Sequence, residues 1–377
     1  MDRICNPLSQ QSGRDQRRRR IRQIAVVIST LVAIVAFKAP AAHALEFPPS
    51  FGLVWGGAGT GAGQFTGLEF LASDSAGNVY AADAADYVPE INHRVQKFSP
   101  DGVYLGGWGG FGTGVGQFTR ITGMSIDRHD VVWTTETYLT TPAFRVQKFT
   151  TTGTPLGEVP WLTFNNLFAL AFDSSTDDVF AISSDPAFVR RFNSSGVLLN
   201  QFNVGALPRS GVVDAAGNLF LALNRGNGPV VKYSPTGTVL ATIDMSASQL
   251  GIDDEGNLYG ASTVTGPNVD TVSKVSPAGE VLARWGGTGT APGQFVVPTG
   301  LAITAAGRVY IGEYTGHRIQ RFAPRDTTPP TIAASVTGGT LGTNGWYVSD
   351  VTVHFTCTDT GSGIPAGACP ADQSLST

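Results

Sequence analysis

Short apolar and polar stretches alternate along most of the chain, and one pattern occurs six times. In each copy a turn is followed by an apolar and an aromatic residue, as in Gly77-Asn78-Val79-Tyr80. Six or seven residues earlier an Asp or Thr closes a short apolar stretch, such as 123–126. Each copy therefore predicts two strands joined by a tight turn. The aromatic positions are Tyr80, Trp133, Phe180, Phe220, Tyr259 and Tyr310, and the earlier residues are Asp74, Asp127, Asp173, Asp214, Asp253 and Thr304.

A third strand is predicted after each aromatic position, ending in a basic residue and a large apolar one. A glycine follows four residues later in five copies, as a tight turn requires, and a fourth strand such as 103–108 comes next. Each unit is thus a four-stranded antiparallel meander, the size and form of a β-propeller blade. We expect the basic side chains to lie on a solvated strand face. The third strands end at Lys97-Phe98, Lys148-Phe149, Arg191-Phe192, Lys232-Tyr233, Lys274-Val275 and Arg321-Phe322.

The sixth unit lacks a fourth strand, because after Phe322 the chain runs into a Pro-rich segment at 326–330. The segment 52–56, which precedes the first unit, ends in Trp-Gly as other fourth strands do. We expect it to pair alongside Arg318 to Phe322, closing a ring of six blades and leaving no free sheet edge. The predicted fold is all-β, with the propeller over 45–325.

Several phrases resemble the NHL repeat. Gly63-Gln64-Phe65, Gly116-Gln117-Phe118 and Gly293-Gln294-Phe295 precede units one, two and six, and 92–98 and 316–322 carry the matching third strands. Units three to five keep only the common strand pattern, without these phrases. The resemblance implies a six-bladed β-propeller, and it implies little about chemistry because the family includes protein-binding, RNA-binding and enzymatic members.

The tail at 326–377 has a different character. Residues 346–357 alternate between apolar and polar as a half-buried strand does, and 359–364 resemble bacterial immunoglobulin-like domains. About 50 residues is half of such a sandwich, so we expect a linker and an incomplete immunoglobulin-like β-sandwich. In an exported protein, Cys357 and Cys369 are expected to form a disulfide that acts as a local staple.

The first 44 residues predict a signal peptide. Five arginines lie within 17–22, an apolar run extends from Ile24 to Phe37, and Ala42-His43-Ala44 follows. The run is too short to span a bilayer, so we expect secretion or delivery to the cell envelope, with a mature chain from Leu45 that has no membrane span. Without the leader, 17 Lys/Arg and 27 Asp/Glu remain, a net charge of −10 rather than −4. Nucleic acid is therefore not an expected partner.

Acidic residues offer one candidate site. Three residues after the strand-two aromatic, units one, two and six carry Asp83, Glu136 and Glu313. Carboxylates at one level of a ring could converge on calcium, a cation that prefers oxygen ligands. Alternatively each could pair within its own blade, because Arg94, Arg145 and Arg318 share one repeat position in those same units. We favour the second interpretation, and no cofactor is predicted.

Histidines and aromatic residues receive structural interpretations. His93 and His317 occupy one repeat position, and a zinc site would need three convergent ligands, so we assign them to the repeat. The six aromatic residues are interpreted as the packing layer between blades. Binding is expected on the longest loops instead, at 84–91, 137–142 and 263–270, which form one rim.

These observations favour an exported non-catalytic binding or scaffold module, whose loops contact an extracellular protein, peptide or glycan. The alternative is a propeller enzyme of the lyase or lactonase type with a metal in the central channel. That enzyme would need carboxylates or histidines at the channel mouth.

Overall fold

The computed structural model describes residues 48–84, 92–137, 144–162, 166–224, 227–263, 270–323, 331–343, 345, 347–358 and 369–375. Their regular secondary structure is almost entirely β-strand, joined by turns, and it includes a short 3-10 helix, η2 (Pro160–Leu162). The predicted signal peptide, the linker at 326–330 and most of the three predicted rim loops lie outside the described residues.

Six four-stranded antiparallel sheets follow one another along the described chain, which confirms the predicted repeat. We number them in chain order. Sheet 1 contains β2 (Leu68–Ser73), β3 (Val79–Ala84), β4 (His93–Phe98) and β5 (Tyr104–Gly109); sheet 2 contains β6 (Ile121–Ile126), β7 (Val132–Thr137), β8 (Phe144–Phe149) and β9 (Pro155–Glu158); sheet 3 contains β10 (Leu167–Asp173), β11 (Asp178–Ser184), β12 (Ala187–Phe192) and β13 (Leu198–Asn203). Sheet 4 contains β14 (Ser210–Val213), β15 (Leu219–Ala222), β16 (Val230–Tyr233) and β17 (Val239–Ile243); sheet 5 contains β18 (Gln249–Ile252), β19 (Leu258–Ser262), β20 (Thr271–Val275) and β21 (Val281–Gly286); sheet 6 contains β22 (Pro298–Ile303), β23 (Val309–Glu313), β24 (Arg318–Ala323) and β1 (Ser50–Gly56).

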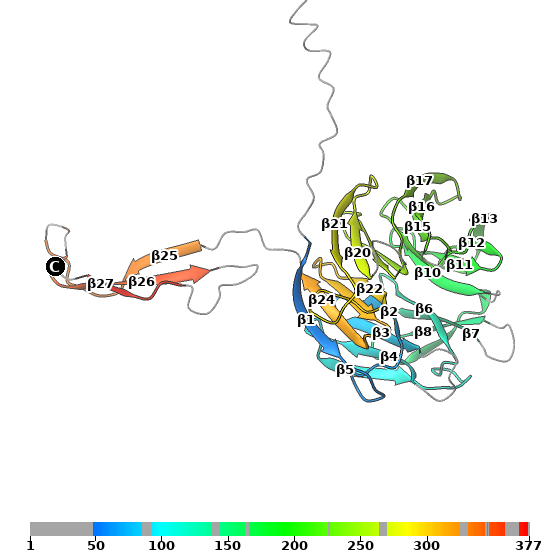
Figure 1. Ribbon diagram of the computed structural model, residues 1–377, viewed down its shortest axis with the longest axis horizontal. Coiled ribbons are helices and arrows are strands. Elements are labelled where there is room, and N and C mark those ends of the chain that lie inside the picture. Colours follow the sequence, from blue (N-terminus) through cyan, green and yellow to red (C-terminus); the bar gives the residue numbers. More distant parts are fainter. Residues whose placement is uncertain are drawn as a thin grey trace, which may run out of the picture. The chain divides into compact units, whose positions relative to one another are not determined.

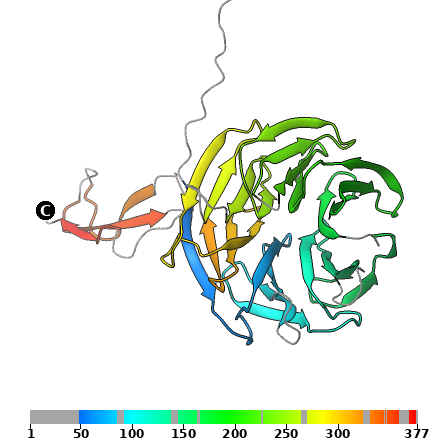
Figure 2. The same cartoon turned by 45° about the vertical axis from the view of Figure 1, so that its right-hand side comes forward.

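The first strand of each sheet lies innermost. These strands contact one another in the order β2, β6, β10, β14, β18, β22 and β2 again. Figure 2 shows the sheets arranged around this centre, with sheet 1 in blue and cyan beside the three orange strands of sheet 6. Together the repeated sheets and their radial order define a β-propeller architecture (Figure 1).

Strand β1 comes from the start of the described chain and supplies the outer strand of sheet 6. It lies antiparallel to β24, with Leu53 opposite Arg321 and Trp55 opposite Ile319. A register shift between Phe51 and Leu53 marks a β-bulge. Sheet 6 therefore combines segments from opposite ends of the propeller, as the strand count from sequence predicts.

The repeated Asp, aromatic and basic residues form one structural unit in sheets 1 to 5. In sheet 1, Asp74 accepts hydrogen bonds from the backbone N–H of Asn78 (2.8 Å) and from the Tyr80 hydroxyl (2.9 Å). Lys97 lies directly opposite Tyr80, with its ammonium 5.0 Å from the ring centroid and 3.4 Å from Asp74. Its side chain is only 17% exposed. The expectation of a solvated basic face is therefore wrong, because the strand-two aromatic and the turn carboxylate cover the lysine.

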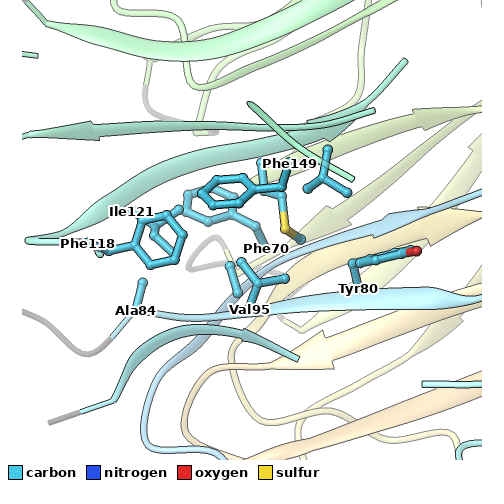
Figure 3. Close-up of a cluster of buried hydrophobic side chains, with 10 residues drawn as sticks. Phe70, Tyr80, Ala84, Val95, Phe118, Ile121 and Phe149 are labelled. Carbon is cyan, nitrogen blue, oxygen red and sulfur yellow. The ribbon is translucent and has the colours of Figure 1, made fainter. Parts of the chain in front are cut away.

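Aromatic and aliphatic side chains pack between neighbouring sheets. Figure 3 shows Tyr80 and Val95 of sheet 1 with Ile121 and Phe149 of sheet 2 in one buried cluster. The strand-two aromatic residues are buried here, as predicted for a packing layer.

Glycines in the outer turns permit a second close contact between sheets. Gly153 has a φ of +84°, and a Cβ atom there would lie 2.6 Å from the Trp108 ring of the preceding sheet. Gly196 has the same relation to Trp161. These positions need glycine both for the backbone angle and for space.

The C-terminal sheet, described here by itself, contains β25 (Thr331–Val336), β26 (Val351–Thr358) and β27 (Gln373–Leu375) in antiparallel order. The strand expected over 346–357 begins only at Val351, since Tyr347 instead forms an isolated bridge with Leu341. The predicted disulfide between Cys357 and Cys369 is confirmed.

Candidate functional site

Each predicted carboxylate lies directly opposite its arginine on the neighbouring strand of one sheet. Asp83 faces Arg94, Glu136 faces Arg145 and Glu313 faces Arg318. The shortest nitrogen–oxygen distances are 3.4, 2.6 and 2.6 Å. The three carboxylates are fully buried. The structure thus brings each carboxylate to a partner within its own blade, as the favoured interpretation expects.

The same arginines hold the loops that link one sheet to the next. We call 57–67, 110–120 and 287–297 the linking loops. The Arg94 guanidinium donates to the carbonyls of Thr60, Gly61 and Gln64 at 2.8–2.9 Å. Arg145 and Arg318 make equivalent contacts with the second and third linking loops. Each arginine therefore connects its carboxylate to a Gly-Gln-Phe loop.

The carboxylates bind the far end of each linking loop. Asp83 accepts hydrogen bonds from the backbone N–H groups of Thr66 and Gly67, at 2.9 and 2.8 Å. Glu136 accepts from Thr119 and Glu313 from Val296. A buried glutamine adds a further clamp, since Gln96 accepts from Gly63 and donates to Gln64. Gln147 and Gln320 do the same in their sheets.

Burial and ion pairing act in opposite directions on Glu136. Burial raises the pKa of this carboxyl, whereas Arg145 and Gln147, each 2.6 Å from Oε1, favour the ionised form.

In the residues that the structure describes, no group of three or more His, Cys, Asp or Glu is placed to hold a metal ion.

The two repeat histidines share a backbone role. The carbonyl of His93 accepts a hydrogen bond from Gly110, and that of His317 accepts one from Gly57, both at 2.7 Å. Each histidine thus anchors the first residues of a linking loop. The His93 ring is buried and lies 5.5 Å from the Phe111 ring.

The central channel is a cavity of about 230 Å³ lined by all six innermost strands. Its lining mixes aliphatic side chains such as Leu71 and Leu301 with serines and with the polar side chains of Arg209 and Gln249. Gln249 crosses it, accepting from the backbone N–H of Leu301 (2.9 Å) and donating to the Leu71 carbonyl (2.8 Å). The channel is therefore bridged by a side chain that sequence analysis did not single out, because Gln249 has no counterpart in the other repeats.

An ion pair crosses the ring beside the channel. Arg209, just before β14, lies 2.7 Å from Glu69 on β2, and its guanidinium also lies over the Phe70 and Phe168 rings. Neither residue recurs at the equivalent position of another repeat, so no internal pattern in the sequence marks them.

A second cavity of about 230 Å³ lies between sheets 2 and 3. Trp133, Trp161 and Phe172 form its aromatic side, and Arg128, His129 and Asp177 lie among its polar lining. The sequence predicts Trp133 only as part of the packing layer between blades. The sequence does mark this cavity in one way: Arg128-His129 occupies two turn positions where the other copies have small or acidic residues.

The predicted rim cannot be placed in full, because 85–91, 138–143 and 264–269 lie outside the described residues. Among the described residues, no helix has the length and apolar character needed to cross a membrane.

The solved structures that are similar to this chain in fold include the following two. A structural genomics protein of unknown function from Bacteroides thetaiotaomicron has a TM-score of 0.51 at 14% identity, covering 71% of this chain and 73% of its own. The WD40 beta propeller domain of Doa1 has a TM-score of 0.48 at 13% identity, covering 74% of this chain and 98% of its own. No protein-family model and no curated protein matches the chain. The comparisons thus concern fold alone.

Proposed function

We propose that this protein is an exported, non-catalytic binding or scaffold module. Its framework is a six-bladed NHL-type propeller over 45–325, closed by β1, and a partial immunoglobulin-like domain over 326–377 follows. Residues 1–44 act as the signal peptide, so the mature chain works outside the cell or in the envelope.

The observation that carries the proposal is how the repeat uses its polar side chains. Asp83, Arg94 and Gln96 all bind one linking loop, and sheets 2 and 6 repeat the arrangement. Such cross-links hold adjacent blades in fixed relation and suit a scaffold that positions variable loops. The cation-ligand interpretation of Asp83, Glu136 and Glu313 gains no support from these contacts.

An extracellular protein, peptide or glycan is the proposed partner, contacted by the rim loops. The acidic mature chain, with a net charge of −10 from 17 Lys/Arg and 27 Asp/Glu, disfavours nucleic acid.

Export is tested by expressing the full chain and a variant lacking residues 2–44 in the same bacterium. We expect the full chain in the extracytoplasmic fraction, with an N-terminus at Leu45, and the shortened chain in the cytoplasm. Retention of an uncleaved full chain inside the cell would remove the export proposal.

Assays on the purified mature chain distinguish a binding module from an enzyme. A binding module should give saturable signals on arrays of glycans and peptides, and its melting temperature should not respond to calcium or chelator. The enzyme alternative requires tightly bound metal and metal-dependent lactone hydrolysis or lyase activity. A calcium-dependent rise in melting temperature that Asp83→Asn/Glu313→Gln abolishes would instead support the acidic positions as a cation site.

A further inference from the structure

Departures from the repeat gather where sheet 2 meets sheet 3. The β6–β7 turn carries Arg128-His129, whereas the equivalent pairs are Ser75-Ala76, Ser174-Ser175, Ala215-Ala216, Asp254-Glu255 and Ala305-Ala306. The facing turn has one residue more between Asp173 and Phe180 than the other copies have, and it places Asp177 at a φ of 61°. Because the repeat fixes the fold, several departures at one interface indicate a site built there.

The polar departures contact one another across the interface. Arg128 makes a two-point ion pair with Asp177, Nε to Oδ1 at 2.5 Å and Nη2 to Oδ2 at 2.6 Å. His129 Nε2 lies 3.1 Å from the same Oδ1. The side chains of Arg128, His129 and Asp177 are 45, 59 and 29% exposed. Three planar polar groups are therefore held together within reach of solvent.

Aromatic side chains line the cavity next to these polar groups. In sheets 1 and 5, the fourth-strand tryptophan packs on the strand-two aromatic of its own sheet, as Trp108 does on Tyr80 at 6.1 Å. In sheet 2 the fourth strand ends at Glu158, and the tryptophan comes from η2 instead. Trp161 keeps the regular contact with the next sheet, since it packs on Phe192 as Trp108 packs on Phe149. Trp133 instead contacts Phe172, at 5.2 Å. The space between Trp133, Trp161 and Phe172 belongs to the cavity.

Size and charge limit what this cavity can hold. Its volume of about 230 Å³ lies just below the roughly 300–1,000 Å³ of pockets for drug-sized ligands, so one small ring is a suitable occupant. Charges of both signs line it, with Asp127, Asp173 and Asp177 against Arg128 and Lys148. Arg128 is already paired with Asp177, and Lys148 lies over the Trp133 ring at 5.1 Å. Neither an anion nor a cation is favoured.

We propose that the cavity binds one neutral sugar residue of a glycan. The carbon-bound hydrogens of the sugar pack on the aromatic side, and its hydroxyls exchange hydrogen bonds with Arg128, His129 and Asp177. The inference rests on the proposed binding function and names its ligand class, but it locates the contact at a blade interface rather than on the rim loops.

The test titrates the mature chain with methyl glycosides of glucose, galactose, mannose, fucose and N-acetylglucosamine, following tryptophan fluorescence and ligand NMR. We expect at least one glycoside to bind, and Arg128→Ala and Asp177→Asn each to weaken it by roughly tenfold or more, as lost hydrogen bonds to charged groups do. Asp101→Asn is the matched control, because it removes the exposed ion pair with Arg321 (2.6 Å), which the cavity lining does not include. It should bind as the unaltered chain does.

Three results would overturn the inference. One is that none of the glycosides binds to the folded chain. Another is binding that survives both substitutions, which would move the contact to the rim loops and leave the proposed function standing. The third is binding of phenethylamine or para-cresol in place of sugars, lost in the same variants, which would reassign the pocket to a different ligand class. Melting temperatures of the variants show that each is folded, and Trp161→Phe offers a second, apolar probe of the same cavity.

Discussion

Sheets 1, 2 and 6 differ from sheets 3, 4 and 5 in how they are held together, although their backbones follow one plan. The first group carries the buried acid–arginine pairs, such as Glu136 with Arg145. In sheets 3 and 5 the paired positions hold Ser183 opposite Phe188 and Ser262 opposite Thr271. Apolar side chains such as Ile182, Val189 and Leu221 fill the corresponding interfaces of sheets 3 and 4.

The acid–arginine pairs occur in the sheets that the linking loops precede. Gly-Gln-Phe occurs at 63–65, 116–118 and 293–295, immediately before the three sheets that carry the pairs. The pairs bind those loops, whereas the four-stranded sheets form with or without them. A polar cross-link in this protein therefore serves the connection between blades, and strand pairing with apolar packing is sufficient for the blade itself.

The largest expected effect comes from Arg145→Ala. It leaves the buried Glu136 carboxylate without its arginine and releases the carbonyls of Thr113, Gly114 and Gln117. Removing one partner of a buried ion pair costs about 3–5 kcal/mol. Chemical denaturation should show this loss of unfolding free energy.

Transplanting the residues of sheet 3 provides the control. Glu136→Ser with Arg145→Phe copies Ser183 and Phe188, so no buried charge remains unpaired. We expect a smaller loss than in Arg145→Ala, with the remaining loss confined to the linking loop. An equal or larger loss would show that the ion pair stabilises the blade, contrary to the comparison.

Glycine substitutions test the contacts between sheets. Gly153→Ala places a Cβ 2.6 Å from the Trp108 ring at a φ of +84°. We expect a loss of roughly 1–2 kcal/mol for the left-handed backbone and about 1–3 kcal/mol more for the clash. Gly293→Ala has a similar φ, +79°, with no atom within 4 Å, so it should show the backbone cost alone in the same thermal unfolding assay. Equal losses would argue against a tight contact between sheets.

Tyr80→Phe makes sheet 1 resemble sheet 4, where Phe220 occupies the equivalent position. The change removes the hydroxyl that donates to Asp74 at 2.9 Å and should cost about 1 kcal/mol. Because Asn78 still donates to Asp74, the turn should remain intact. Equilibrium unfolding of the pair of proteins measures the difference, and an unchanged free energy would make the hydroxyl dispensable.

The smallest expected effect is a dependence of stability on acid. Burial alone would raise the pKa of Asp214, but hydrogen bonds from Asn218 and the nearby Lys232 outweigh it and lower the pKa below 3.8. Hydrogen bonds and a nearby basic residue also lower the pKa of Asp74 and of Asp173. The unfolded chain then takes up protons first, so stability is constant above the unfolded pKa and falls as pH drops below 3.8. Melting temperatures measured between about pH 3 and pH 6 should decline at the acid end, and less steeply in Asp214→Asn.

Sequence alone determined the elements that repeat. The register of Asp74, Tyr80 and Lys97 predicted the strands, and matching positions predicted the pairing of Asp83 with Arg94. These features depend on neighbours close in the chain, so their spacing is visible in the sequence. The covering of Lys97 was not visible, because it depends on which way a side chain turns after the strands assemble.

Tertiary structure alone decided what meets between sheets. Gln249 reaches β2 from β18, Arg209 reaches Glu69, and Arg128 meets Asp177 across an interface. No other repeat has the same residue at the equivalent position, so no periodicity in the sequence marks these residues. The partner of each is fixed only when the innermost strands come together around the channel.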